Sequence, residues 1–188
     1  AEAGQVLLEH RLELLPELSG VIENSTGGAI AYARDMERMR ADGLMLLPAM
    51  VYKSDARETI AHFRAVARAG ELPVMIYNNP VSYGVDVTPP MLEELSDEPM
   101  LVALKESSDD VRRVTDVVNA VGDRYILFCG VDDLYLESAL LGEVAAQLGP
   151  LVGPVRGHGH VLELGVEALD ALREGSRVAI VHARDRAG

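Results

Sequence analysis

Two short apolar runs, each followed by a reactive side chain, place the strongest constraint on the fold of this 188-residue chain. Val74–Ile76 is followed by Tyr77 and Leu101–Leu104 by Lys105, with a helix predicted over Thr88–Leu95 between them. A strand, a helix and a second strand of this spacing predict two neighbouring parallel strands. Their carboxyl ends meet at one edge of the sheet, where α/β proteins build their sites, so we expect the phenol and the amine side by side.

Lys105 stands out because the chain uses arginine at almost every other basic position. Of 17 basic residues, only Lys53 and Lys105 are lysines. Arginine stays charged, whereas a partly desolvated lysine has a lowered pKa and can attack a carbonyl group. The amine and the phenol of Tyr77 therefore indicate Schiff-base chemistry. The structural alternative is a lysine at a strand end whose stem packs while its charged head reaches solvent.

The rest of the chain repeats the order of strand then helix. Predicted helices cover residues 5–18, about 27–40, 55–69, 111–121 and 134–141, and predicted strands cover 43–50 and 125–129. Residues 19–23 are apolar but too short to predict a strand. Strand starts about 24 to 30 residues apart predict an α/β fold with a parallel sheet, either a (β/α) barrel or a doubly wound sheet. The glycine-rich motifs of dinucleotide and nucleoside-triphosphate sites are missing from the sequence.

Composition excludes several classes of function. The net charge of −13 argues against a nucleic-acid or anionic-membrane partner. The longest apolar runs have the length of strands, which predicts no transmembrane span, and the first residues show no signal-peptide pattern. One cysteine, Cys129, excludes an internal disulfide framework. These features together predict a cytoplasmic location.

Six stretches over residues 21–144 resemble one known family. They are Asn24-Ser25-Thr26, ADGLMLLPAMVY (41–52), AHFRAVA (61–67), IYNNP (76–80), LVALKESS (101–108) and GVDD (130–133). The chain is similar here to the dihydrodipicolinate synthase/N-acetylneuraminate lyase family of class I aldolases. The Tyr-Asn-x-Pro and Lys-Glu pair, one strand–helix unit apart, is the most specific of these matches.

The resemblance implies an α/β fold of the TIM (β/α)8 barrel type and a Schiff base between Lys105 and the 2-oxo carbon of a pyruvate-type keto acid. Tyr77 would relay protons to and from the reacting substrate. No metal and no organic cofactor is implied, because the protonated imine is the electron sink. The family also implies a homo-oligomer, a dimer or a tetramer. The resemblance thus predicts a carbon–carbon or carbon–nitrogen lyase.

Three further positions are candidate substrate-binding residues. Ser82 stands where the synthases of the family carry an arginine that holds the substrate carboxylate, so a true dihydrodipicolinate synthase is not expected. Asp132 follows a predicted strand, in a loop that lies near the distal end of the substrate in the resembling family. Tyr52 lies where the family places a tyrosine that reaches a neighbouring subunit. A metal site at His158 and His160 is not expected, because no third ligand is near in sequence.

Two alternatives remain for the activity. One is deamination of a cyclic imino acid of the hydroxy-pyrroline-carboxylate type. The other is a catalytically inactive remnant, because the Thr-Thr-Gly-Glu-like loop that binds the keto-acid carboxylate in the family is missing from this sequence. Losing two or more charge-assisted hydrogen bonds, each worth about 1.5–3 kcal/mol, would weaken binding by several powers of ten.

The ends of the chain predict its domain division. Residues 1–143 carry 12 basic and 25 acidic groups, whereas residues 144–188 carry five of each. We expect a partial (β/α) barrel over 1–143, incomplete at its N-terminal strands, and a divergent segment over 144–188. A shifted reading frame and a divergent tail are both open for that segment. At 188 residues the chain is shorter than the ~250 of a typical closed barrel.

Overall fold

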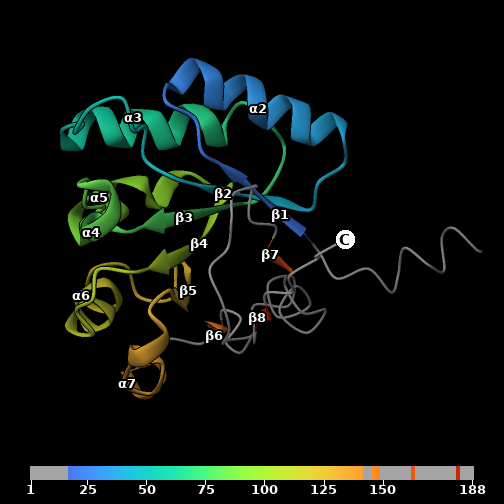
Figure 1. Cartoon of the computed structure of the whole chain (residues 1–188). Helices are drawn as coiled ribbons and strands as arrows, with labels where there is room; N and C mark the ends of the chain where they lie inside the picture. The colour runs from blue at the N-terminus through green and yellow to red at the C-terminus, as the bar shows by residue number, and fades with distance from the viewer. Residues whose placement is uncertain (1–16, 142–144, 149–161, 164–180, 183–188) are drawn as a thin grey trace, which may run out of the picture.

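The computed structural model describes residues 17–141, 145–148, 162–163 and 181–182 (Figure 1). Residues 5–16 of the first predicted helix, and both His158 and His160, lie outside the described residues. The strands are β1 (Glu17–Val21), β2 (Gly43–Leu46), β3 (Val74–Asn78), β4 (Leu101–Glu106), β5 (Ile126–Cys129), β6 (Ala145–Leu148), β7 (Leu162–Glu163) and β8 (Val181–His182). The helices are α2 (Thr26–Arg38), α3 (Ala56–Ala67), α4 (Pro80–Tyr83), α5 (Pro89–Glu94), α6 (Arg112–Val121) and α7 (Tyr135–Leu141), with 3-10 turns η1 (Leu95–Asp97) and η2 (Asp132–Leu134).

The order of the strands decides between the two folds that the sequence left open. In the sheet, the order is β7-β1-β2-β3-β4-β5-β6-β8, and β1 through β6 are parallel neighbours in chain order. A doubly wound sheet reverses its strand order at a switch point, and this sheet does not. Figure 1 shows α2, α3, α5 and α6 following one another along the same side of the sheet. The fold is therefore of the TIM-barrel type, present as an incomplete barrel.

Side-chain caps define where the first two described helices begin. Ser25 Oγ accepts a hydrogen bond from the backbone N of Gly28 at 3.2 Å, which caps α2. Asp55 accepts from the backbone N of Glu58 at 2.8 Å, and the Glu58 carboxylate accepts from the backbone N of Asp55, which completes a capping box at α3. Each bond satisfies an amide that has no partner within its helix.

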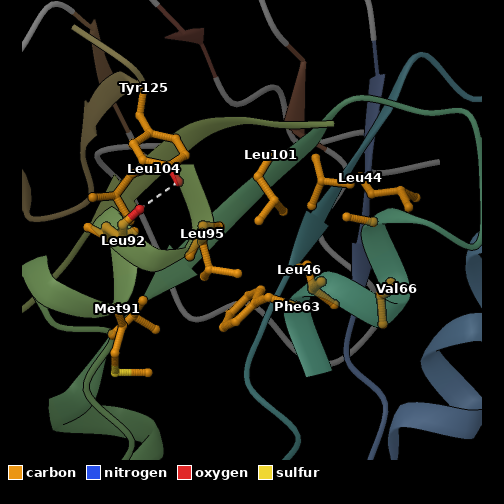
Figure 2. Close-up of a cluster of buried hydrophobic side chains, with 14 of the residues drawn as sticks. Leu44, Leu46, Phe63, Val66, Met91, Leu92, Leu95, Leu101, Leu104 and Tyr125 are labelled. Carbon is orange, nitrogen blue, oxygen red and sulfur yellow. Dashed lines mark hydrogen bonds between the residues drawn. The ribbon is translucent and has the colours of Figure 1, made fainter. Parts of the chain in front are cut away.

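The larger hydrophobic core lies between the helices and the sheet (Figure 2). Phe63 of α3 and Leu92 of α5 are completely buried there. They pack with strand residues of the same cluster, Leu44, Leu46, Leu101 and Leu104. The Tyr125 hydroxyl, buried in this core, donates a hydrogen bond to the backbone oxygen of Leu92 at 2.9 Å (Figure 2). This bond links α5 to the start of β5 within an otherwise apolar layer.

A smaller core covers the other face of the sheet. Its buried members are Leu18, Met45, Leu47, Met75, Ala103 and Phe128, and Tyr77 packs against them. Successive side chains of a strand point to opposite faces, so Met45 faces this inner side while Leu44 and Leu46 face the helices. This inner face is the one that the site uses.

An extra residue in β4 determines which face of the sheet the later side chains of this strand point to. Val74 pairs with Leu101, but the next residue, Met75, pairs with Ala103, so Val102 is an extra residue in β4. Leu101 belongs to the helix-side core and Ala103 to the inner core, although strict alternation would place both on one face. The extra residue therefore turns Ala103, and with it Lys105 two residues further, to the inner face.

The structure corrects the sequence interpretation near residue 17. β1 covers Glu17–Val21 and pairs parallel with β2. This strand includes the last two residues of the predicted helix 5–18 and the first three of the stretch 19–23, which the sequence left undecided. The one-turn helix α4 was not predicted, and β3 and β4 extend far enough to include Tyr77 and Lys105. None of the helices in the described part has the length and apolar character needed to cross a bilayer.

Candidate active site

Tyr77 and Lys105 are direct neighbours across β3 and β4. The two residues are register partners, and both lie near the carboxyl ends of their strands. Lys105 is 9% exposed, and its Nζ lies 4.4 Å from the centroid of the Tyr77 ring. An ammonium over the face of a phenol is attracted by the ring's negative π surface. The sequence placed an amine and a phenol at one sheet edge, and the structure brings these two side chains into contact.

The phenol of Tyr77 is held from two sides. Asn79 Nδ2 donates a hydrogen bond to the Tyr77 hydroxyl at 3.2 Å. The Tyr83 ring packs edge-on against the Tyr77 ring, with 5.7 Å between their centroids. Burial, and then the neighbouring Tyr77, raises the pKa of Tyr83 above its usual range. The short helix α4 therefore places the protonated phenol of Tyr83 against the ring of Tyr77.

A buried polar pair lies one residue beyond Tyr77 and Lys105. Asn78 Nδ2 donates to Glu106 Oε2 at 2.9 Å, and the two residues are 0% and 6% exposed. Glu106 Oε1 accepts from the backbone N of Ser108 at 2.7 Å. Burial raises the pKa of Glu106, and the hydrogen bonds from Asn78 and Ser108 oppose that rise. A buried carboxylate is tolerated here because both of its oxygens accept hydrogen bonds.

An ion pair continues this polar group toward the surface. Arg113 of α6 donates to both carboxylate oxygens of Asp86, at 2.8 and 2.9 Å. The guanidinium of Arg113 holds the pKa of Asp86 below its usual range. Asp86 also accepts from Asn78 Nδ2 at 3.2 Å, so the strand ends are connected to α6 through charged hydrogen bonds.

A buried hydroxyl lies beside Lys105. Ser107 is 3% exposed, and its Oγ has no hydrogen-bond partner within the described part of the chain. A Cβ atom on Gly130, directly after β5, would lie 1.9 Å from Ser107 Oγ and 3.0 Å from Lys105 Cε. The absence of a side chain at Gly130 therefore makes room for both groups.

A small cavity lies behind the strand ends, on the side of α6 and α7. Its volume is about 10 Å³, and its lining includes Glu106, Ser108, Cys129 and Ser138. That volume holds about one water molecule and is too small for a keto acid. Over the described residues, no three His, Cys, Asp or Glu side chains gather as ligands for a metal ion.

Two of the three candidate substrate-binding residues, Ser82 and Tyr52, are exposed and make hydrogen bonds with residues other than Lys105. Ser82 is exposed in α4, where its backbone N donates to Asn79 Oδ1 at 3.0 Å. Tyr52 is 61% exposed, and its hydroxyl donates to Glu58 Oε1 at 3.2 Å. That hydrogen bond to Glu58 raises the pKa of Tyr52. Asp132 begins η2, at the same end of the sheet, and its side chain lies outside the described part.

The sequence interpretation assigned no role to Asn78, Glu106, Asp86 or Arg113. One signal was present: a polar residue follows each of Tyr77 and Lys105 at the end of a strand. Side chains that alternate along a strand put these second polar residues on the helix side, away from the amine. Their partners Asp86 and Arg113 come from other elements, so sequence spacing did not identify them.

The model of the dihydrodipicolinate synthetase family matches residues 14–147. A 4-hydroxy-tetrahydrodipicolinate synthase of Clostridium perfringens is 32% identical over 128 residues, which are 68% of this chain and 44% of that protein. The enzyme of the same name from Archaeoglobus fulgidus is 30% identical over 141 residues, 72% of this chain and 49% of that protein. The chain therefore spans less than half the length of these relatives.

Solved structures show the same fold. The 4-hydroxy-tetrahydrodipicolinate synthase of Methylacidiphilum fumariolicum SolV superposes with a TM-score of 0.66 at 28% identity, covering 69% of this chain and 43% of that one. YagE of E. coli K12, a prophage protein of the dihydrodipicolinic acid synthase family in complex with pyruvate, gives 0.64 at 27% identity, covering 68% and 44%.

Proposed function

Because the chain belongs to the dihydrodipicolinate synthetase family, we propose that it forms a Schiff base between Lys105 and the 2-oxo carbon of a pyruvate-type keto acid. The observation that carries this proposal is the contact of Lys105 Nζ with the Tyr77 ring, at 4.4 Å, on the inner face of the sheet. A nearly buried amine beside a phenol provides a nucleophile and a proton relay in one place.

In the proposed reaction, the neutral amine of Lys105 attacks the 2-oxo carbon and forms a carbinolamine. Counted from the ammonium, two of the three protons on Nζ leave with the carbonyl oxygen as water, and the third stays on the imine nitrogen. A carbon–nitrogen double bond replaces the carbon–oxygen double bond, so no oxidant or reductant is needed. Tyr77 transfers protons between nitrogen and oxygen. The protonated imine then accepts electrons when a neighbouring bond breaks or forms.

The finer assignment is a lyase or aldolase that acts on a pyruvate-type 2-oxo acid and is not a true dihydrodipicolinate synthase. Position 82 is serine, whereas the resemblance associates an arginine with the synthases, and Ser82 is exposed. Deamination of a cyclic imino acid uses the same lysine and remains the alternative reaction. A catalytically inactive remnant is the alternative from another class.

Assembly and location belong to the same proposal. We propose that the chain forms a homo-oligomer. The contact of Lys105 with Tyr77 lies within one copy of the chain, and in the oligomer Tyr52 would reach the site of a neighbouring copy.

We also propose the domain division between residues 143 and 144 and a cytoplasmic location. β6, at residues 145–148, pairs parallel with β5, so at least one strand beyond that division continues the sheet.

Borohydride trapping tests the proposal. The protein is incubated with pyruvate, reduced, and its mass is measured, with Lys105→Ala as the variant and Lys53→Ala as the matched control. Lys53 is the only other lysine in the chain and is exposed, so it reports non-specific reductive alkylation. We expect a mass increase of one reduced pyruvate in the wild type and in Lys53→Ala, and none in Lys105→Ala. No adduct in a folded wild type would favour the inactive remnant.

A further inference from the structure

Asn78 and Glu106 form the next register pair after Tyr77 and Lys105 on β3 and β4. Because side chains alternate along a strand, this second pair points to the helix side of the sheet while the first points to the inner face. The two pairs are therefore back to back on consecutive residues. A shift of either strand end moves both pairs together.

The second pair is bonded through side chains as well as through the backbone. Asn78 Nδ2 donates to Glu106 Oε2 at 2.9 Å, and the backbone N of Ser107 donates to the backbone oxygen of Asn78 at 2.8 Å. Asn78 Oδ1 accepts from the backbone N of Val87 at 2.9 Å, and Glu106 Oε1 accepts from Ser108 N at 2.7 Å. Every side-chain oxygen of the pair is thus engaged.

The pair is also connected to the helix layer. Asp86 accepts from Asn78 Nδ2 at 3.2 Å and pairs with Arg113 of α6 through two bonds of 2.8 and 2.9 Å. The Arg113 side chain is 17% exposed, so this ion pair is partly shielded from solvent. The ends of β3 and β4 are consequently linked to each other and to α6.

We infer that Asn78 and Glu106 are positioning residues, whose cross-strand hydrogen bond holds the Tyr77 ring against Lys105 Nζ. This inference rests on the proposed Schiff-base function and adds to it a second pair of residues that do not touch the substrate. Reacting groups must be oriented closely, and a displacement of 1 Å can slow a reaction by about 100-fold. An unpaired strand end beside the site would allow such displacements.

A purely stabilising role accounts less well for a carboxylate at position 106. Glu106 is 6% exposed, and burial raises its pKa, which means that its charge is costly in the folded protein. Apolar side chains of similar volume are often as stable as buried charged groups. The carboxylate instead fixes the orientation of the groups around it, because its two oxygens accept hydrogen bonds from Asn78 Nδ2 and Ser108 N at the same time.

Two variants and one matched control separate positioning from stability. Glu106→Gln replaces one acceptor oxygen with an NH2 group, so either Asn78 Nδ2 or Ser108 N faces a donor. Asn78→Ala removes the same bond from the other strand. Glu98→Gln is the control: Glu98 is 4% exposed and pairs with Arg68 at 2.5 Å, but it lies before the amino end of β4, about 20 Å along the chain from Lys105.

Two readouts are measured on variants whose circular dichroism shows a folded protein. The first is the rate of borohydride-trapped adduct formation at saturating pyruvate. The second needs no substrate: acetic anhydride labels amines, and the ratio of labelling at Lys105 to labelling at Lys53 is followed against pH. Only these two lysines are present, so Lys53 is an internal reference. Loss of stability alone would not change this ratio in a folded protein.

For Glu106→Gln and Asn78→Ala we expect trapping to slow by tenfold or more and the labelling ratio to change by threefold or more. Glu98→Gln should remain within twofold of the wild type in both readouts. A wild type without adduct would contradict the proposed function, and the labelling ratio would still test the positioning. Variants at 78 and 106 that behave like Glu98→Gln in both readouts would overturn the inference; one folded variant is enough to decide.

Discussion

Gly130 lies directly against Lys105: a Cβ atom at this glycine would be 3.0 Å from Lys105 Cε. The same atom would be 3.0 Å from the backbone oxygen of Glu106 and 1.9 Å from Ser107 Oγ. The end of β5 and the end of β4 are therefore packed as closely as their backbones allow at the site. This contact leads to the first of four predictions.

Gly130→Ala should displace the Lys105 amine and reduce trapping of pyruvate by tenfold or more. Overpacking of this kind also costs about 1–3 kcal/mol of stability. Trapping rate and urea unfolding measure the two effects. Gly27→Ala is the matched control, because a Cβ at Gly27 in α2 meets no atom within 4 Å, and alanine is favoured in helices. A Gly130→Ala variant as reactive as Gly27→Ala would contradict the close packing at Lys105.

Tyr77→Phe keeps the ring next to Lys105 and removes only the hydroxyl that accepts from Asn79. If the hydroxyl relays protons, imine formation should slow by about 10²–10⁴-fold while pyruvate binding changes little. Stopped-flow mixing followed by borohydride quench measures the rate. Tyr125→Phe, which also loses a tyrosine hydroxyl but in the helix-side core, should keep the wild-type rate. Equal rates in both variants would show that the Tyr77 hydroxyl does not relay protons.

Tyr125→Phe should lower the free energy of unfolding by about 1–3 kcal/mol, because it leaves the buried backbone oxygen of Leu92 without its donor. Burial raises the pKa of Tyr125 to about 12, so the hydroxyl stays protonated as a donor at neutral pH. Urea unfolding gives the difference. Tyr52→Phe is the control, since Tyr52 is 61% exposed and surface changes usually cost less than about 0.5 kcal/mol.

Stability should depend on pH through His62, which is 3% exposed and links α2 and α3 to the end of β2. Its Nε2 donates to the backbone oxygen of Leu47 at 3.1 Å, since a carbonyl only accepts, and its Nδ1 then accepts from Thr26 Oγ1 at 3.0 Å. Burial lowers the pKa of His62. The unfolded chain therefore binds this proton first, and stability should fall as pH drops below about 6.5, the pKa of an unperturbed histidine.

The measurement is urea unfolding between about pH 7.5 and 5.5 for the wild type and for His62→Gln. One histidine contributes at most about 1.4 kcal/mol per pH unit. The wild type should lose stability over this range faster than the variant, and the difference between the two curves isolates His62 from other titrating groups. Parallel curves would show that His62 is protonated in the folded protein as readily as in the unfolded one.

Local patterns predicted much of the fold. The capping residues Ser25 and Asp55 begin α2 and α3 as their sequences indicate, and β3, β4 and β5 lie where apolar runs predict them. β1 was missed because five residues next to a helix-like pattern carry little local signal, and its pairing with β2 becomes visible only in the sheet. The predicted roles of Lys105, Tyr77, Ser82, Asp132 and Tyr52 stay predictions, although Lys105 and Tyr77 are in contact.

The sequence by itself determined where most of the described helices begin, which apolar runs form β3, β4 and β5, and that an amine and a phenol lie at the ends of two neighbouring strands. These are local properties, because helix periodicity, capping and short apolar runs depend on residues a few positions apart. Only the tertiary structure decided the face on which Lys105 lies, through the extra residue Val102, and the bonding of Asn78 to Glu106 behind it. Register and buried hydrogen bonds depend on groups 28 residues apart in the chain, and the free energy of packing them together selects one arrangement.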